Sequence, residues 1–308
     1  MNKAKIKFLN IQKSKIIPVF FIILIFLSVI SASEMSLKFT NKPKGDMIMS
    51  TRLIDYSQDS VGKLLVTTGF KRGESYENGY IYLLNYNGEV IWNKEIGNVD
   101  STMASITDSH PPGARFYPKD AYGIDFNGNG QNDILLLTES HFYILTEQGI
   151  SKKYFKSVPI SEIKSADIFG EGKEVALLAG VNASMISYDS YDYIFSTIAK
   201  PSKPLNSITS ANLDSDIERE IITGGENISG EGNISIYDYN SSTTPNWTKT
   251  HSYITGAGMA IKKVIATNLD NGSEYQVGDE KIEIIALSEK YVYCFHTKEG
   301  GTLHLLWL

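Results

Sequence analysis

The stretch Asp125-Phe-Asn-Gly-Asn-Gly-Gln-Asn-Asp133 is the most informative part of this chain. Side chains with oxygen atoms stand at alternate positions around a glycine, which is the pattern of a loop that wraps a cation. Degraded copies, each followed by an apolar run typical of a β-strand, start at Asp55, Asp167, Asn212 and Asn268. The five starts lie 70, 42, 45 and 56 residues apart. Such periods predict a repeat architecture.

The same succession of predicted strands follows each loop. After the apolar run comes a strand of alternating polar and apolar residues, such as residues 80–84 or 142–145, and then a strand with an aromatic residue near its end. Period-two runs rich in Tyr, Ile and Val predict β-structure. The aromatic positions are Trp92, Phe155, Phe195, Trp247 and Trp307. The repeat predicts an all-β protein, a β-propeller of about five four-stranded blades.

On these residues, the chain resembles β-propellers built from FG-GAP or VCBS repeats, such as the N-terminal region of integrin α subunits, and their quinoprotein-like relatives. The resemblance covers residues 47–308. It is carried by the acidic loop that recurs before a strand, and by the tyrosine-rich, tryptophan-ended pattern YIYLLNYNGEVIWNKE at residues 80–95. The resemblance implies a propeller but no particular activity, since unrelated functions occur on one fold.

The loop at residues 125–133 has the ligand spacing of a calcium loop. Its candidate ligands at positions 1, 3, 5, 7 and 9 are Asp125, Asn127, Asn129, Gln131 and Asp133. Gly130 at position 6 permits a sharp turn, and Leu136 replaces the bidentate glutamate of an EF-hand at position 12. Oxygen ligands suit a hard cation better than zinc. We therefore predict Ca²⁺ here. The alternative is a hydrogen-bonded Asx turn without metal.

The fourth copy is a second, weaker calcium candidate. Its predicted ligands are Asn212, Asp214, Asp216 and Glu220. Ile217 replaces the glycine of the second copy, which makes the same tight turn harder to form. The first, third and fifth copies have poorer ligand sets and are expected to hold their turns by hydrogen bonds alone.

The start of the chain predicts export. Residues 1–15 contain five lysines and no acidic residue, residues 16–30 are almost entirely apolar, and residues 31–33 are small. Residues 1–33 are therefore predicted to be a cleaved signal peptide. The alternative is an uncleaved membrane anchor over residues 16–32, near the lower length limit of a membrane span. Both alternatives export the rest of the chain.

A linker over residues 34–46 precedes the predicted propeller at residues 47–308. Its units are expected to start near residues 47, 122, 164, 208 and 262. The sequence stops after Trp307-Leu308, where a fourth strand would end. Two alternatives stay open: five blades that close into a small ring, or a truncated member of a larger propeller.

Charge and cysteine content narrow the classes of partner. Removal of residues 1–33 takes away five positive charges and no negative ones, so the formal net charge moves from −6 to −11. Such an acidic surface repels phosphate backbones and argues against nucleic acid as a partner. The single cysteine, Cys294, can form no internal disulfide and is expected to be a small core residue.

Six N-glycosylation sequons lie in the second half of the chain. Their asparagines are Asn182, Asn227, Asn233, Asn240, Asn246 and Asn271. Clustered sequons in an exported chain predict a glycoprotein in an organism that has the machinery.

Motifs of catalysis are missing from the sequence. The five histidines lack the spacing of a zinc site, and no nucleophile elbow or phosphate-binding loop occurs. Quinone-dependent dehydrogenases of the resembled fold use a pair of adjacent cysteines, and this chain has one cysteine. We therefore expect no catalytic residues and no enzyme activity. The insertion at residues 98–119 is either a ligand-contacting loop or a tolerated insertion.

These observations predict an exported, non-catalytic β-propeller of the cell surface that binds a protein or glycan partner and has calcium-stabilised repeat loops. Membrane contact is expected only through residues 16–32, if that segment stays uncleaved. The alternative is an enzyme, either a quinoprotein-like oxidoreductase or a carbohydrate-active propeller, which clustered Asp, His and Arg at the inner ends of strands would favour. A third alternative is a structural module of an envelope layer.

Overall fold

The computed structural model divides the chain into two units, residues 1–41 and 42–308. It describes the following parts of the second unit: residues 47–54, 62–72, 75–96, 118–138, 141–146, 151–156, 159–214, 216–242, 246–267, 282–297 and 303–307. The predicted signal peptide or anchor and most of the insertion at 98–119 lie outside the described residues. No helix in the described part is long and apolar enough to cross a membrane.

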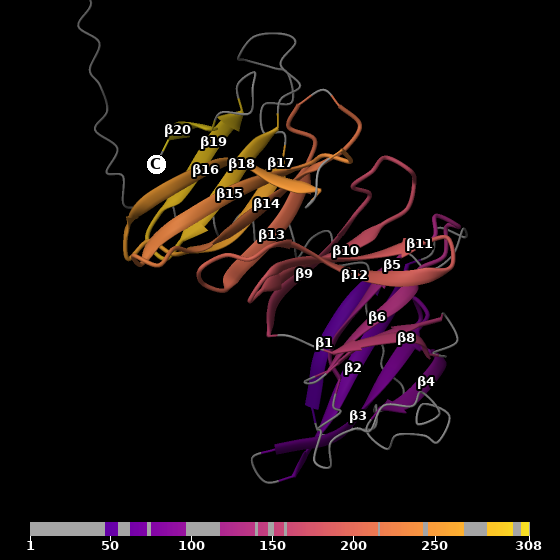
Figure 1. Cartoon of the computed structure of the whole chain (residues 1–308). Helices are drawn as coiled ribbons and strands as arrows, with labels where there is room; N and C mark the ends of the chain where they lie inside the picture. The colour runs from indigo at the N-terminus through magenta and orange to yellow at the C-terminus, as the bar shows by residue number, and fades with distance from the viewer. Residues whose placement is uncertain are drawn as a thin grey trace, which may run out of the picture. The chain divides into compact units, whose positions relative to one another are not determined.

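The described residues form five four-stranded antiparallel sheets, and each sheet uses four strands that follow one another in the chain (Figure 1). The first sheet holds β1 (Met47–Ile54), β2 (Lys63–Arg72), β3 (Ser75–Leu84) and β4 (Val90–Ile96). The second holds β5 (Pro118–Ile124), β6 (Asp133–Thr138), β7 (His141–Leu145) and β8 (Ser151–Lys156). The third holds β9 (Ile160–Ala166), β10 (Val175–Gly180), β11 (Ala183–Asp189) and β12 (Asp192–Ala199). The fourth holds β13 (Leu205–Ala211), β14 (Glu220–Glu226), β15 (Glu231–Tyr239) and β16 (Trp247–Ala257). The fifth holds β17 (Ile261–Thr267), β18 (Glu283–Ser288), β19 (Val292–Thr297) and β20 (Leu303–Trp307). The prediction of an all-β protein is confirmed.

Burial along the strands explains their sequences. The second strand of a sheet is mostly apolar and buried, as in β10, where every residue of Val175–Gly180 is buried. The fourth strand lies at the outer edge and alternates, as in β12, where exposed Asp192 and Ile194 flank buried Tyr193. Strands covered on both faces lack the polar alternation of half-exposed strands. Cys294 in β19 is fully buried, as expected.

Two hairpins share one turn sequence, Asn-x-x-Gly-Glu. Asn85 Oδ1 accepts hydrogen bonds from the backbone N–H groups of Asn87 and Glu89, both at 2.9 Å. Asn227 makes the equivalent bonds in the fourth sheet, to Ser229 and Glu231. The glycine of each turn, Gly88 or Gly230, has a φ of 78° or 80°, a conformation that side chains oppose. Local hydrogen bonds therefore fix the register of both hairpins.

Neighbouring sheets pack face to face through apolar side chains. One core cluster joins the first and second sheets, through Leu65 and Leu136 among others. Similar clusters join the second to the third, the third to the fourth and the fourth to the fifth. The first strands also adjoin, because β1 contacts β5, and β13 contacts both β9 and β17. Among the described residues, no core cluster joins the fifth sheet to the first.

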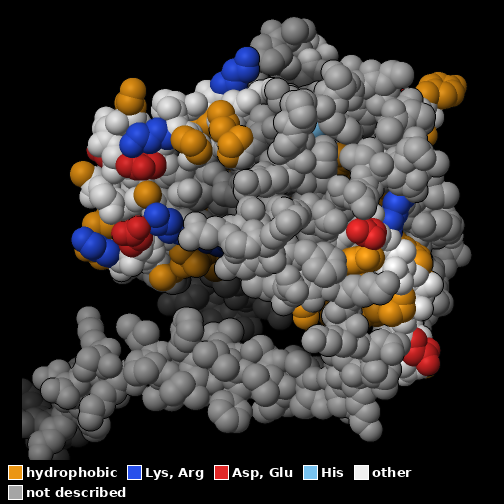
Figure 2. Space-filling view, turned by 90° about the horizontal axis from the view of Figure 1, so that it is seen from below, with side chains coloured by type: hydrophobic (Ala, Val, Ile, Leu, Met, Phe, Trp, Pro, Cys, Tyr) orange, Lys and Arg blue, Asp and Glu red, His pale blue; other side chains and the backbone are white. Residues whose placement is uncertain are grey.

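The described surface is mixed in character. Figure 2 shows hydrophobic side chains in separate groups between charged ones. Tyr191 at the tip between β11 and β12 is 95% exposed, and Ile228 in the Asn227 turn is 78% exposed. Single exposed apolar residues of this kind are ordinary on protein surfaces.

Candidate metal centre

The acidic loops join the first strand of a sheet to its second strand. The structure describes three of the five copies: the second loop (residues 125–132), the third loop (167–174) and the fourth loop (212–219, except 215). The acidic residues of the first copy and the whole of the fifth copy lie outside the described residues. The three described loops follow β5, β9 and β13, which are the first strands of three successive sheets.

The second loop is closed by hydrogen bonds from its own backbone. Asp125 accepts bonds from the N–H groups of Asn129, at 3.1 Å, and Gly130, at 2.8 Å. Asn127 Oδ1 accepts a second bond from Asn129, at 3.0 Å, and Asn129 Oδ1 accepts one from the N–H of Gln131, at 2.8 Å. These contacts are those of consecutive Asx turns, which calcium loops and metal-free loops have in common.

Asp133, the predicted ligand at position 9, lies at the start of β6 and is 6% exposed. Its Oδ2 atom accepts a hydrogen bond of 2.5 Å from the hydroxyl of Tyr193 in the third sheet. This carboxylate therefore links two sheets. Asp125, Asn127 and Asn129 lie together on the loop, and one oxygen of Asp133 is engaged elsewhere.

The third loop repeats the second in detail. Asp167 accepts hydrogen bonds from the N–H groups of Glu171, at 3.2 Å, and Gly172, at 2.8 Å. Gly172 has a φ of 74°, close to the 77° of Gly130. The shared bonds show that Asp at position 1 and Gly at position 6 serve the turn itself.

The three loops contact one another in order. The N–H of Glu174 donates to the backbone carbonyl of Asp125, at 2.8 Å, and the N–H of Arg219 donates to that of Ile168, also at 2.8 Å. A Cβ atom at Gly170 would lie 2.6 Å from Cγ1 of Ile217, so the fourth loop packs closely on the third. The loops therefore form a continuous stack rather than isolated surface turns.

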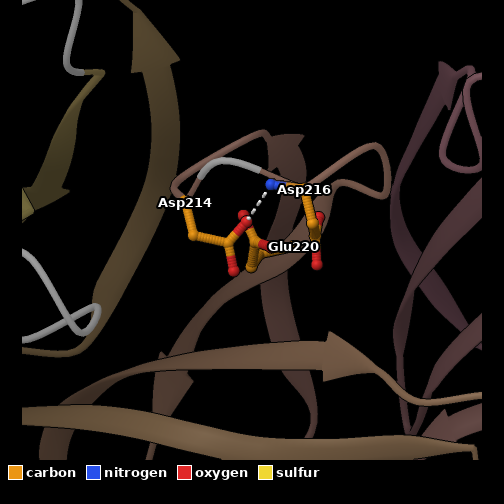
Figure 3. A group of neighbouring side chains, drawn as sticks. All are labelled: Asp214, Asp216 and Glu220. Carbon is orange, nitrogen blue, oxygen red and sulfur yellow. Dashed lines mark hydrogen bonds between the residues drawn. The ribbon is translucent and has the colours of Figure 1, made fainter.

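The fourth loop gathers three carboxylates (Figure 3). Single carboxylate oxygens of Asp214, Asp216 and Glu220 all lie within 4.8 Å of one another. The N–H of Asp216 donates to Asp214 Oδ1 at 2.9 Å. The fourth predicted ligand, Asn212, instead donates its amide N–H to the carbonyl of Asp216, at 2.6 Å, which leaves its own side-chain oxygen as an acceptor. Three of the four predicted ligands are thus brought together.

Glu220 is the buried member of this cluster, with 4% of its surface exposed. Its Oε2 atom accepts a hydrogen bond of 2.5 Å from the N–H of Leu213. Its Oε1 atom is buried and has no hydrogen-bond partner among the described residues. The same holds for Oδ1 of Asp238. Both side chains line a hollow of about 220 Å³ beside the loop, together with Asp214.

Electrostatics reflect this crowding. Burial, reinforced by the charge of Asp214, raises the pKa of Glu220 to about 7. Partial desolvation and the charge of Asp214 also raise the pKa of Asp216 to about 6, although Asp216 is an exposed residue. Buried and adjacent carboxylates destabilise one another's charged forms. A divalent cation would replace this repulsion by coordination, and carboxylate oxygens are the ligands that Ca²⁺ prefers.

The backbone explains why Ile217 is compatible with this site. Glycines of the second and third loops have positive φ, whereas Ile217 does not. The fourth loop therefore makes a different turn, and the side chain of Ile217 lies against Gly170. The sequence predicts that Ile217 hinders a turn shared with the second loop, but in the structure Ile217 is a contact between the third and fourth loops.

A polar row on the first strands was missed in the sequence. Its members each stand four residues before the end of the first strand of their sheet: Ser50, Asp120, Glu162, Ser207 and Lys263. Glu162 accepts hydrogen bonds from Lys263 and from the hydroxyl of Ser207. That constant position would have revealed the row, had the strand ends been known.

Arg52 and Tyr122 extend the row. Arg52 binds Asp120 Oδ2 at 2.6 Å and the hydroxyl oxygen of Tyr122 at 2.8 Å. Tyr122 in turn donates to Asp120 at 2.7 Å. Burial, with the charge of Asp120, raises the pKa of Tyr122. These contacts tie β1 to β5.

The sequons differ in their surroundings. Asn240 and Asn246 are exposed, whereas Asn182, Asn227 and Asn233 are partly buried, and Asn271 lies outside the described residues. The amide group of Asn227 donates to Glu231 at 2.9 Å, and that of Asn233 donates to the hydroxyl of Ser235 at 3.2 Å. The amide nitrogen is the atom that a glycan would modify.

Comparison with known proteins gives the fold alone. No protein-family model matches the chain, and none of the curated proteins matches it. The resemblance to FG-GAP and VCBS propellers therefore stays a prediction. Among solved structures, the chain is similar to the biofilm matrix protein Bap1 of V. cholerae, with a TM-score of 0.50 and 19% sequence identity. The match covers 86% of this chain and 40% of Bap1, so the chain spans less than half the length of that protein.

Proposed function

We propose that the chain is an exported, non-catalytic β-propeller that binds a partner at the cell surface, with a calcium ion stabilising the fourth loop. The observation that carries the calcium assignment is the buried carboxylate of Glu220, which has an unpartnered oxygen beside Asp214 and Asp216. An unpaired charge inside a protein is costly. A cation on these oxygens offsets that cost.

The propeller assignment is supported by the order of the sheets. Each of the four steps along the chain places a sheet face to face with the next one. The polar row lies on the first strands, and its bonds cross from one sheet to another. Blades arranged around an axis bring their first strands together in this way.

Export is supported by the basic and apolar start of the sequence. Bap1, a solved protein with a similar fold, is a biofilm matrix protein. At 19% identity, this likeness supports the fold, and the role is proposed on the sequence.

A test of export is protease treatment of intact cells that express the full chain with a C-terminal tag. We expect the tag to be lost from intact cells, while a cytoplasmic control protein stays whole until lysis. Protection of the tag in intact cells, followed by digestion after lysis, would contradict export. The size of the chain recovered from cells, compared with that of the uncleaved chain, also shows whether residues 1–33 are removed.

One observation favours the enzyme alternative: Arg52, Asp120 and Tyr122 cluster on two first strands. In this cluster and around Glu162, each charged group is bonded to an oppositely charged one. Pairing of this kind holds neighbouring strands together, so we assign the polar row a structural role and no catalytic one. The test is a comparison of the wild type with Arg52→Met for oxidation or hydrolysis of saccharides. Equal rates at background level support the assignment.

A further inference from the structure

A hollow of about 790 Å³ lies between the third and fourth sheets, beside the loop stack. Its walls include Phe169 of the third loop, Glu218 of the fourth loop, Ser196 of β12 and both Tyr239 and Trp247 of the fourth sheet. The volume falls within the range of about 300–1,000 Å³ that is usual for small-molecule sites. It is separate from the cavity beside Glu220, which different residues line.

Three aromatic rings form one wall. The rings of Phe169 and Tyr239 lie 5.0 Å apart at an interplanar angle of 71°, and those of Tyr239 and Trp247 lie 5.1 Å apart at 61°. Edge-to-face contacts hold each ring in a fixed orientation. Tyr239 is central to the set, and its hydroxyl accepts a hydrogen bond of 3.3 Å from the amide of Asn246. The wall is therefore rigid, apolar in the middle and polar at one edge.

Polar groups also line the hollow. The hydroxyl oxygen of Ser196 is buried and has no hydrogen-bond partner among the described residues, although it belongs to a side chain that lines the hollow. The lining also carries four carboxylates, Glu171, Glu174, Asp189 and Glu218, against one ammonium group, Lys173. Lys173 is itself paired with Glu171 at 3.4 Å. The hollow is therefore rich in hydrogen-bond acceptors and negatively charged.

We propose that this hollow binds a saccharide without acidic groups. Hexose rings have an apolar C–H face that stacks on aromatic side chains, and hydroxyl groups around their rim that donate hydrogen bonds to carboxylates. A purely apolar ligand would bury the carboxylates without partners, which is unfavourable. An acidic ligand would be repelled by them. The inference rests on the proposed function and names the chemical class of the partner.

The test is calorimetric titration of the full chain, made in a host that does not N-glycosylate, so that Asn246 carries no sugar. The probes are cellotriose, mannotriose, maltotriose and triacetylchitotriose, with trigalacturonate as the acidic control. We expect one or more neutral trisaccharides to bind and trigalacturonate not to bind. Tyr239→Ala should weaken binding by about tenfold or more, as loss of a central aromatic contact does.

Two further variants keep the test decisive. Tyr191→Ala removes an exposed tyrosine outside the hollow and should leave affinity unchanged. Ile194→Trp adds bulk to a lining side chain that is 44% exposed, so it should block the hollow without removing a core residue. The Ile194→Trp variant keeps the inference testable if Tyr239→Ala does not fold.

Three outcomes overturn the inference: no neutral probe binds, trigalacturonate binds as well as the neutral probes do, or Ile194→Trp and Tyr239→Ala bind as well as the wild type. Failure here is distinguishable from failure of the proposed function. If only the saccharide inference fails, calcium-dependent stability and export persist. If the proposed function fails, they are absent.

Discussion

The hydroxyl group of Tyr193 donates a hydrogen bond to Oδ2 of Asp133, at 2.5 Å, although 60 residues separate the two in sequence. Tyr193 lies in the outer strand of the third sheet and is 6% exposed, and its ring packs edge to face on Phe126, with centroids 5.3 Å apart. The bond joins a loop-closing carboxylate of one sheet to the edge of the next. It is a structural use of a residue that the sequence pattern assigns to calcium.

Tyr193→Phe should therefore destabilise the fold. The variant keeps the ring and removes the donor to a buried carboxylate, which costs about 1.5–3 kcal/mol for a hydrogen bond to a charged group. Urea unfolding measures this loss. Tyr191→Phe, at an exposed position two residues earlier, is the matched control and should change the free energy of unfolding by less than about 0.5 kcal/mol. Equal stability of the Tyr193→Phe variant and the wild type would refute the link.

Alanine substitutions at Gly170 and Gly172 distinguish backbone strain in the third loop from contact with the fourth loop. Both have positive φ, 68° and 74°, so alanine strains the backbone at either position. A Cβ atom at Gly170 would also collide with Ile217, whereas one at Gly172 would meet nothing within 4 Å. Gly170→Ala should therefore lower the melting temperature more than Gly172→Ala does. Ile217→Ala should relieve most of the difference in a double variant. If the two single variants melt together, the loops do not pack as described.

Acid should weaken the contact between β1 and β5. Burial alone would raise the pKa of Asp120, but hydrogen bonds from Arg52 and other groups outweigh it and hold that pKa below its ordinary value of 3.8. A lowered pKa adds stability above the unfolded value, and this stability is lost as pH falls through the folded value. Because Arg52 is 44% exposed, we expect about 1 kcal/mol or less.

The measurement is urea unfolding of the wild type and of Asp120→Asn, from about pH 6 down to a pH below the pKa of folded Asp120. The variant should be less stable at about pH 6 and equal to the wild type once the pH is below the lowered pKa of folded Asp120. A difference that stays constant over the whole range would show that the loss is not electrostatic.

Glycosylation should follow exposure of the sequons. In a host with N-glycosylation, mass spectrometry of tryptic glycopeptides should find Asn240 or Asn246 occupied more fully than Asn233. Asn240 and Asn246 are exposed, whereas Asn233 is partly buried in the third strand of its sheet and bonded to Ser235. Higher occupancy at Asn233 would mean that modification precedes formation of this sheet.

Local patterns predicted most of the fold. Each described loop motif is followed by a strand, and the alternating runs at residues 80–84 and 142–145 correspond to β3 and β7. The alternating strand of the third unit, β11, was not recognised, because it begins with the small residues Ala183 and Ser184 and its tyrosine, Tyr188, comes only near its end. Packing between sheets decides burial there, and Ser184 is 1% exposed.

The candidate site was less predictable. The spacing of Asp214, Asp216 and Glu220 was visible, but the second loop ranked first because it has the glycine and the full ligand series. The burial of Glu220 depends on its place at the start of β14, and the role of Ile217 depends on the third loop. The aromatic wall joins Phe169 to Tyr239, 70 residues later, and such a contact between sheets leaves no local pattern.

In the proposed calcium site of the fourth loop, Glu220 is the buried ligand. The most direct measurement is the melting temperature of the full chain in chelator and in excess Ca²⁺, for the wild type, Glu220→Gln and Asp125→Asn. At about one hundred times Kd, binding adds about 2.7 kcal/mol, which raises the midpoint by about 5–10 °C for a domain of this size. We predict this rise for the wild type and for Asp125→Asn. Glu220→Gln should lose the rise and, in chelator, melt no lower than the wild type, because glutamine carries no buried charge. If calcium does not raise the melting temperature of the wild type, or if it still raises that of Glu220→Gln, the fourth loop does not hold calcium through Glu220.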